Sequence, residues 1–287
     1  MNSIKYFLQS LIIYFLFLIF KILGYKFSAI LSSIIFRYIG PFFRSTKLIK
    51  DNILRAFPNL NETAVKKISE EMWCNYGKIL SEYMFIKDFR HSKISSHIKI
   101  IGKDILSKVK ESGKPVIFVS GHFDNFELMA MILEKEGINL AAIYRPLNNK
   151  FLNYSMEKIR KKYICKNQIK KGTRGTKELL RYFKQGTSIA LMIDQRVSQG
   201  IKSNFFNQAA LTTTLPAQFV KKYNCNIVPI YIERVEGYKF KLEIYKPISY
   251  AKDMTIPSIT LNLNEILETM ITRNPGQWIW SHNRWKI

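Results

Sequence analysis

Cysteine is scarce in this chain, and the few that occur are not spaced for metal binding. Cys74, Cys165 and Cys225 stand far apart, and no two of them form a C-x-x-C pair. An odd and sparse set of cysteines is typical of reduced thiols in the cytoplasm. It argues against both a disulfide framework and a structural zinc site.

Acidic residues are also few: the sequence has 21 Asp and Glu against 45 Lys and Arg, which gives a net charge of +24. Such a charge favours nucleic acids, anionic membranes and acidic proteins as partners. The chain lacks zinc-finger spacing and an RNP-type aromatic block, so we expect no nucleic-acid partner. A Lys-rich surface without a particular partner remains the alternative interpretation.

Internal repeats and low-complexity segments are absent from the sequence as well. Hydrophobic residues make up 47% of the chain and aromatic residues 14%. This content is ample for a packed core and excludes a disordered protein. A length of 287 residues fits one large domain or two small ones.

The N-terminus carries two apolar stretches. Tyr6–Phe20 would reach roughly 22 Å as a helix, short of the ~30 Å hydrocarbon core, and Ile4 and Ile22–Leu23 lengthen it to a marginal span. No small-residue cleavage site follows, so we do not expect a removed signal peptide. Phe27–Ile39 is broken by serines and an arginine and resembles an interfacial amphipathic helix. A transmembrane span and a half-buried helix both remain open.

The flanking charges predict the orientation of this anchor. Only Lys5 precedes the anchor, whereas the basic residues Arg37, Arg44, Lys47 and Lys50 follow it. By the positive-inside rule the rest of the chain lies on the cytoplasmic side of the membrane. We therefore divide the chain into an N-terminal membrane anchor with an interfacial helix, residues 1–45, and a main domain, residues 46–287.

The main domain alternates helical and strand patterns after a long amphipathic helix that begins at an N-cap, Asn61. Strands are predicted at Ile98–Ile101, Val116–Ser120, Ile138–Tyr144, Ser188–Ile193, Ile227–Glu233 and Tyr238–Ile244. Further helices are predicted at Asp104–Glu111, Asn125–Glu136, Phe151–Tyr163, Thr176–Lys184, Thr213–Tyr223 and Ile259–Arg273. This order predicts an α/β fold with a mostly parallel mixed sheet flanked by helices, the last two strands forming an antiparallel hairpin at one edge.

The segment Gly121–Leu128 combines a histidine and carboxylates at a strand-to-helix turn, where open α/β sheets place their chemistry. Glu127 reaches His122 only if the histidine precedes the helix, because five helical residues would separate them by about 140°. A carboxylate on one ring nitrogen fixes the tautomer and leaves the other nitrogen as a base. No activated serine or cysteine is evident, so direct attack by a substrate hydroxyl on an acyl donor fits best.

Two other interpretations of this segment stay open. His122 is an ordinary surface histidine in the first. In the second, His122, Asp124 and Glu127 bind a metal, although no second histidine lies close in sequence. We expect neither a metal nor a cofactor.

The segment Val119–Leu128, with its H-x-x-x-x-E core, resembles the late acyltransferases of lipid A biosynthesis, the lauroyl/myristoyl or HtrB-type family. Five further segments fit the pattern of that family in the same order. They are Asn52–Pro58, Tyr144–Pro146, Lys170–Gly175, Asp194–Gln195 with Phe205–Phe206 after it, and Pro275–Lys286. The resemblance therefore extends over nearly the whole chain.

This resemblance implies a glycerolipid-acyltransferase-like fold and an acyltransferase of lipopolysaccharide synthesis at the cell inner membrane. The donor would be an acyl carrier protein thioester, and the acceptor a hydroxyl of an anionic lipid A precursor similar to Kdo-lipid IVA. His122 would be the general base and Glu127 its partner. Substrate-binding roles are implied for Arg145, Asp194, Arg174 and Asp124.

Each of these roles has a competing explanation. Arg145 suits a phosphate or an oxyanion but also a structural salt bridge, and Arg174 lies either in an anion-binding turn or in a solvated basic loop. The tryptophans of the C-terminal segment rest either at the membrane interface or in the core; they are Trp278, Trp280 and Trp285.

Three positions depart from the family pattern: Asp124 replaces a small residue, Phe126 a tryptophan and Asn207 a glycine. Asp124 would either change the pKa of His122 or share the orienting role of Glu127. These departures bear on the acceptor and the acyl chain more than on the reaction type. Two rival functions are also open. One is acylation of another membrane lipid, such as a lysophospholipid, an ornithine lipid or a glycolipid, and the other is a catalytically silent membrane-associated protein.

Overall fold

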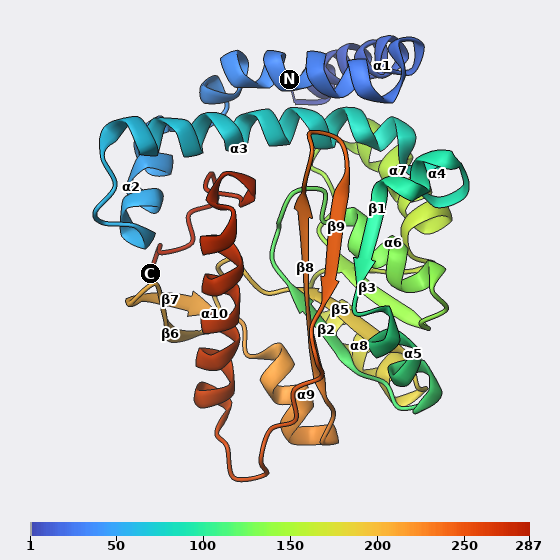
Figure 1. Ribbon diagram of the computed structural model, residues 1–287, viewed down its shortest axis with the longest axis vertical. Coiled ribbons are helices and arrows are strands. Elements are labelled where there is room, and N and C mark those ends of the chain that lie inside the picture. Colours follow the sequence, from blue (N-terminus) through green and yellow to red (C-terminus); the bar gives the residue numbers. More distant parts are fainter. Residues whose placement is uncertain (1) are drawn as a thin grey trace.

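The computed structural model describes residues 2–287, and its centre is a seven-stranded mixed sheet (Figure 1). The strands follow the order β1-β9-β8-β2-β5-β3-β4. Their bounds are β1 Ile98–Ile101, β2 Ile117–Ser120, β3 Leu140–Tyr144, β4 Asn167–Lys170, β5 Ser188–Met192, β8 Ile227–Arg234 and β9 Phe240–Ile244. All neighbouring pairs are parallel except β8 and β9. The predicted α/β fold with a mostly parallel sheet is confirmed.

Helices cover both faces and one end of this sheet, with α6 and α10 on opposite sides in Figure 1. The α-helices are α1 Asn2–Ile39, α2 Thr46–Ala56, α3 Glu62–Glu82, α4 Ile86–His91, α5 Lys103–Glu111, α6 Glu127–Lys135, α7 Lys150–Ile159, α8 Thr173–Lys184, α9 Leu215–Tyr223 and α10 Ile256–Arg273. A π-helical turn, Arg160–Ile164, extends α7, and short 3₁₀ turns occur at Gly40–Phe42, Tyr83–Phe85, Lys93–His97 and Pro275–Gln277. The predicted N-cap is present, since the backbone N–H of Ala64 donates to Asn61 Oδ1 at 2.9 Å.

The hairpin of β8 and β9 does not form an edge of the sheet, which corrects the prediction. β1 pairs in parallel with the outer side of β9, with Ile98 opposite Phe240. This pairing satisfies backbone groups that an edge strand would expose to solvent. β1 was predicted as a strand, but its partner lies about 140 residues away in sequence, beyond the reach of any local pattern.

Three short strands have no counterpart in the sequence prediction. β4 has one buried residue, Ile169, and so lacks an apolar run. β6, Ile201–Phe205, and β7, Gln208–Thr212, form a separate antiparallel ribbon. The connecting residues Phe206 and Asn207 have φ values of 52° and 57°, as a two-residue hairpin turn requires. Asn207 therefore occupies a left-handed position, which asparagine tolerates better than most side chains and where glycine is also at ease.

α1 lies along the outside of α3 (Figure 1). Its serines Ser10, Ser28 and Ser32 are buried against the protein. The Ser32 hydroxyl donates to the Gly77 carbonyl of α3 at 2.6 Å, and a Cβ on Gly77 would lie 2.2 Å from the Ser32 carbonyl oxygen. Gly24 interrupts the helix with φ 73° and ψ 170°, between the two apolar stretches predicted from the sequence.

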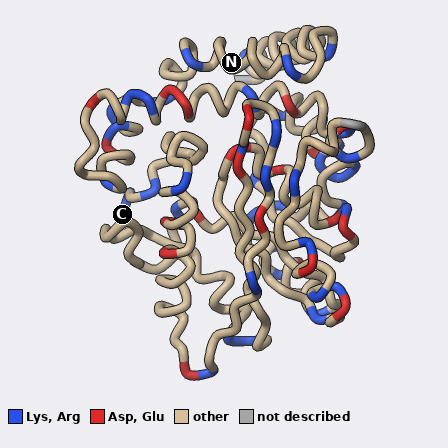
Figure 2. Tube along the Cα trace, in the orientation of Figure 1, with Lys and Arg blue, Asp and Glu red and all other residues tan. Residues whose placement is uncertain are grey.

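The outer face of α1 is apolar and exposed. Its exposed large side chains are Ile4, Phe7, Leu8, Leu11, Ile12, Tyr14, Phe15, Leu18, Ile22, Leu23, Phe27, Ile30, Ile34, Tyr38 and Ile39. Figure 2 shows no acidic residue along this helix. A soluble helix has the opposite arrangement, with its apolar side inward. α1 is also the one helix within residues 2–287 that is long and apolar enough to cross a membrane.

Candidate active site

His122 and Asp194 meet because they follow two neighbouring parallel strands. Ser120 at the end of β2 lies opposite Met192 at the end of β5, and each site residue is two positions further along. The Nδ1 atom of His122 lies 2.8 Å from Asp194 Oδ1. Because a carboxylate only accepts hydrogen bonds, Nδ1 carries a proton, and in the neutral ring Nε2 then has the lone pair. Gln195 Nε2 lies 3.5 Å from that second ring nitrogen.

The Asp194 carboxylate is fully buried and held from three directions. Its Oδ2 accepts the His122 backbone N–H at 2.8 Å and the Trp278 indole N–H at 2.9 Å. Burial acts to raise the pKa of Asp194, but the charge of His122 and these hydrogen bonds outweigh it and lower the pKa to about 2. Asp194 is therefore a charged carboxylate that orients the imidazole.

Glu127 was predicted as the partner of His122, and the structure corrects that contact. Glu127 is the first residue of α6, and its Oε1 accepts the Tyr83 hydroxyl and the guanidinium of Arg160, whose Nε lies 2.9 Å away. Because Asp194 already holds the Nδ1 of His122, Glu127 orients an arginine instead.

Asp124 was predicted to bind substrate or to act on His122, and the structure places it in a buried ion network. Its Oδ1 lies 2.7 Å from Arg234 Nη2, and Arg234 also pairs with Glu82 at 2.6 Å. Burial raises the pKa of both carboxylates despite the guanidinium. With none of its side chain exposed, Asp124 has no access to a substrate. Its φ of 39° lies in the left-handed region that favours glycine.

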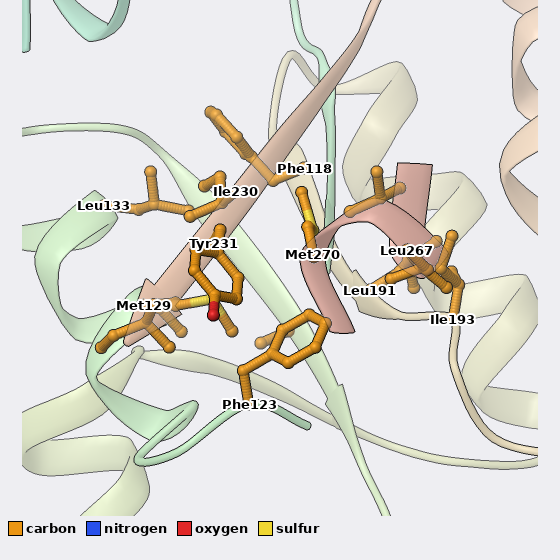
Figure 3. Close-up of a cluster of buried hydrophobic side chains, with 14 of the residues drawn as sticks. Phe118, Phe123, Met129, Leu133, Leu191, Ile193, Ile230, Tyr231, Leu267 and Met270 are labelled. Carbon is orange, nitrogen blue, oxygen red and sulfur yellow. The ribbon is translucent and has the colours of Figure 1, made fainter. Parts of the chain in front are cut away.

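A cavity of about 960 Å³ opens beside His122. Side chains of the central strands and α6 form its apolar part, and several appear in Figure 3. They include Phe118, Met129, Leu133, Leu191, Ile193 and Ile230. The volume is near the upper end for small-molecule sites, roughly 300–1,000 Å³. The cavity can therefore hold a long apolar group with one end at His122.

Basic side chains line the rest of the cavity. They are Arg44, Arg145, Arg160, Lys171, Lys177 and Arg196. Glu127 is the acidic side chain among the described lining residues. Arg145 directly follows β3 and is exposed, as expected for a ligand-binding arginine. Arg174 lies on the exposed first turn of α8 and does not line the cavity, whereas the neighbouring Lys171 does.

Arg160 is a cavity residue that no sequence pattern singles out. It begins the π-helical turn after α7, within the basic run Arg160-Lys161-Lys162, where nothing marks one cation as special. Glu127 holds its Nε and Nη2, while its Nη1 is buried without a hydrogen-bond partner among the described residues. Because Arg160 lines the cavity, its guanidinium is a candidate for binding an anionic ligand there.

The C-terminal segment, residues 275–286, supplies two further site residues, Trp278 and His282. Trp278 bonds Asp194, and His282 lines the cavity. The tryptophans of this segment are buried, with 2% exposure for Trp278, 0% for Trp280 and 5% for Trp285. The membrane-interface interpretation of these residues is therefore wrong, and the core interpretation is correct.

The chain is similar to several known proteins. The whole chain, residues 1–287, matches the family model described as bacterial lipid A biosynthesis acyltransferase. The lipid A biosynthesis myristoyltransferase of Escherichia coli K12 is 20% identical over 234 residues, which are 80% of this chain and 71% of that protein. A lipid A biosynthesis acyltransferase of Haemophilus influenzae is 23% identical over 248 residues, 85% of this chain and 78% of that protein.

A solved structure also resembles the chain. The 1-acyl-sn-glycerophosphate acyltransferase PlsC from Thermotoga maritima aligns with a TM-score of 0.41 and 14% identity. The alignment covers 88% of this chain and 99% of that one.

Proposed function

Since the chain belongs to the bacterial lipid A biosynthesis acyltransferase family and is an acyl-transferring enzyme of that pathway, we propose the following reaction. A fatty acyl group passes from an acyl carrier protein thioester directly to a hydroxyl of a phosphorylated lipid A precursor similar to Kdo-lipid IVA. The observation that carries this proposal is the His122–Asp194 pair at the mouth of an apolar cavity with basic walls.

His122 acts as the general base in this reaction. Asp194 fixes the Nδ1–H tautomer, so the lone pair of Nε2 accepts the proton of the acceptor hydroxyl as its oxygen attacks the thioester carbonyl. The tetrahedral intermediate then collapses to the new ester, and the departing thiolate recovers that proton from the imidazolium. Asp194 stabilises the imidazolium in between, and no covalent acyl-enzyme is needed.

Glu127 contributes to this site through Arg160. The carboxylate holds the guanidinium at the cavity wall, where it binds a phosphate of either substrate. Arg145 and Lys171 add further positive charge at the same cavity. The acidic carrier protein, the phosphorylated acceptor and an anionic membrane leaflet are all attracted to a chain of net charge +24.

The enzyme works at the cytoplasmic face of the inner membrane, with α1 lying in the interface. This placement is supported by the exposed apolar outer face of α1 and by its serine-bearing contact with α3, which leaves its polar side against protein. Residues 1–45 then serve as the anchor and residues 46–287 as the catalytic domain.

An assay of product mass tests the proposal. Purified enzyme in detergent is given acyl carrier protein thioester together with a lipid A precursor, a lysophospholipid or an ornithine lipid in separate reactions. We expect acylation of the lipid A precursor and loss of at least about 10³-fold in rate for His122→Ala. Acylation of another lipid alone would reassign the acceptor. Full transfer by His122→Ala would contradict the role of the base, and no transfer to any acceptor would favour a catalytically silent protein.

A further inference from the structure

A second imidazole, that of His282, lines the same cavity as His122. Its Nε2 accepts the backbone N–H of Arg196 at 3.0 Å. A backbone N–H is a fixed donor, so Nε2 carries no proton and the neutral ring has its proton on Nδ1. No described residue accepts a hydrogen bond from that Nδ1–H. His282 is thus a cavity-lining residue with one donor that no described residue uses.

The backbone around His282 is firmly held. Asn52, which is buried on α2, donates from Nδ2 to the carbonyls of Trp280 and His282, each at 2.8 Å. The Tyr76 hydroxyl lies 3.0 Å from the Ser281 hydroxyl. Asn52 and His282 belong to two segments on which the family resemblance rests, Asn52–Pro58 and Pro275–Lys286. The reaction described above gives no role to either Asn52 or His282. The Asn52 contact holds the backbone of His282, and the Arg196 N–H holds its ring.

The charge state of His282 follows from the same contacts. Burial, assisted by the positive charges of His122 and nearby arginines and opposed by Asp194, lowers the pKa of His282 to about 4. The ring is therefore neutral at physiological pH. A neutral imidazole can donate the hydrogen bond of its N–H to a developing oxyanion.

The two imidazoles are complementary because residues 194–196 contact both rings. Asp194 takes the Nδ1–H of His122, which leaves its Nε2 as the base with Gln195 Nε2 3.5 Å away. Arg196 occupies the Nε2 of His282 and leaves its Nδ1–H as a donor. One ring can accept a proton and the other can stabilise negative charge at the same cavity.

We propose that His282 is the oxyanion donor of the acyl transfer, its Nδ1–H bonding the thioester carbonyl oxygen as the acceptor hydroxyl attacks. This inference rests on the proposed function. The hydroxyl proton passes to His122 Nε2, the carbonyl electron pair moves onto oxygen, and His282 donates a hydrogen bond without transferring its proton. When the carbon–sulfur bond breaks, the oxygen regains its double bond and the thiolate takes the proton from His122.

Two isosteric substitutions separate this role from a structural one. The amide of asparagine reaches the position of the imidazole Nδ1, whereas the amide of glutamine reaches that of Nε2. His282→Asn keeps a donor towards the cavity but gives up the contact with the Arg196 N–H. His282→Gln keeps an acceptor for Arg196 but loses the cavity donor. The control is His91→Gln on α4, an exposed histidine outside the cavity lining.

The experiment measures kcat and KM with saturating acceptor, together with the melting temperature of each variant. We expect kcat to fall about 10²-fold or more in His282→Gln, as for loss of one oxyanion donor, and much less in His282→Asn, with KM nearly unchanged. His91→Gln keeps the rate of the wild type. The reverse order, or equal losses in the two His282 variants, overturns the proposal in favour of a structural role.

A spectroscopic measurement on the wild type reads the tautomer of His282 directly. ¹⁵N-histidine NMR reports the tautomer of each of the four histidines, and His282 is assigned by the signal missing in His282→Gln. We expect a neutral Nδ1–H ring between pH 5.5 and 8, because this range lies above the pKa of His282, about 4. A neutral Nε2–H ring would overturn the proposal. A wild type that transfers no acyl group contradicts the proposed function instead, whatever this tautomer is.

Discussion

Two carboxylates that lie three residues apart in the motif, Asp124 and Glu127, each pair with an arginine. The two pairs differ in whether the arginine lines the cavity. Asp124 pairs with Arg234, whose side chain is 4% exposed and is shared with a second buried carboxylate, Glu82. Glu127 pairs with Arg160, which lines the cavity and has an unpaired nitrogen. The residue types are alike, so chemistry alone does not separate the pairs. Arg234 has no access to the cavity, so its pair with Asp124 is structural. Arg160 lines the cavity, so its pair with Glu127 is a candidate for substrate binding.

Replacing Arg234 with methionine should give the largest loss of stability. The substitution leaves Asp124 and Glu82 buried together without their cation, and breaking a buried pair in this way costs about 3–5 kcal/mol. Urea unfolding followed by circular dichroism measures the loss. A variant that unfolds at the same urea concentration as the wild type would show that this pair does not hold the fold.

Arg160→Met should change activity more than stability. Glu127 remains bonded to the Tyr83 hydroxyl, so less than about 2 kcal/mol of unfolding free energy is expected to be lost. Loss of a charge-assisted contact to a phosphate should lower kcat/KM about 10²-fold, or ~3 kcal/mol. Steady-state kinetics and urea unfolding on the same preparation separate the two effects. If Arg160→Met loses stability as Arg234→Met does, the contrast between the pairs fails.

Acid should lower the stability of the protein through His282, which lines the same cavity as Arg160. Its pKa of about 4 in the folded protein lies below the ordinary 6.5, so the unfolded chain binds more protons between these values. The contribution of this group to the free energy of unfolding is therefore fully present above pH 6.5 and decreases as the pH falls towards 4. The total decrease is about 1–2 kcal/mol after allowance for partial exposure. Melting temperatures between pH 7 and pH 4.5 should fall less steeply in His282→Gln, which lacks this titrating group. Parallel curves would contradict the burial of a neutral ring.

The sequence predicted the part of the site that is local along the chain. The apolar run before Ser120 marks a buried strand, so the position of His122 at its end followed from pattern alone. Asp194 was likewise expected to close a strand. Its contact with His122 depends on β5 lying beside β2, and strand order leaves no local signal.

Residues that act through distant contacts were misassigned or missed. Glu127 is near His122 in sequence, but its position at the start of α6 directs it to Tyr83 and Arg160. The partner of Asp124 is Arg234, 110 residues further along the chain. The C-terminal segment has a recognisable sequence pattern, but the pattern alone assigns it no role. In the fold, Trp278 donates a hydrogen bond to Asp194 and His282 lines the cavity.

The central claim is that Asp194, and not Glu127, orients the catalytic base. The Oδ2 of Asp194 accepts two N–H groups, from the His122 backbone and from Trp278. In Asp194→Asn the amide oxygen must keep that place, so the amide NH₂ faces His122 Nδ1 and forces the proton onto Nε2. The base is then lost, as in other triads where the same substitution costs about 10⁴-fold in kcat.

The most direct measurement compares kcat for Asp194→Asn and Glu127→Gln, with melting temperatures to confirm that both variants fold. We predict a loss of about 10⁴-fold in Asp194→Asn. For Glu127→Gln, which keeps an oxygen for the Arg160 guanidinium, we predict about 10- to 100-fold. A folded Asp194→Asn variant with nearly normal kcat, beside a Glu127→Gln variant that is inactive, would contradict the account and restore Glu127 as the partner of His122.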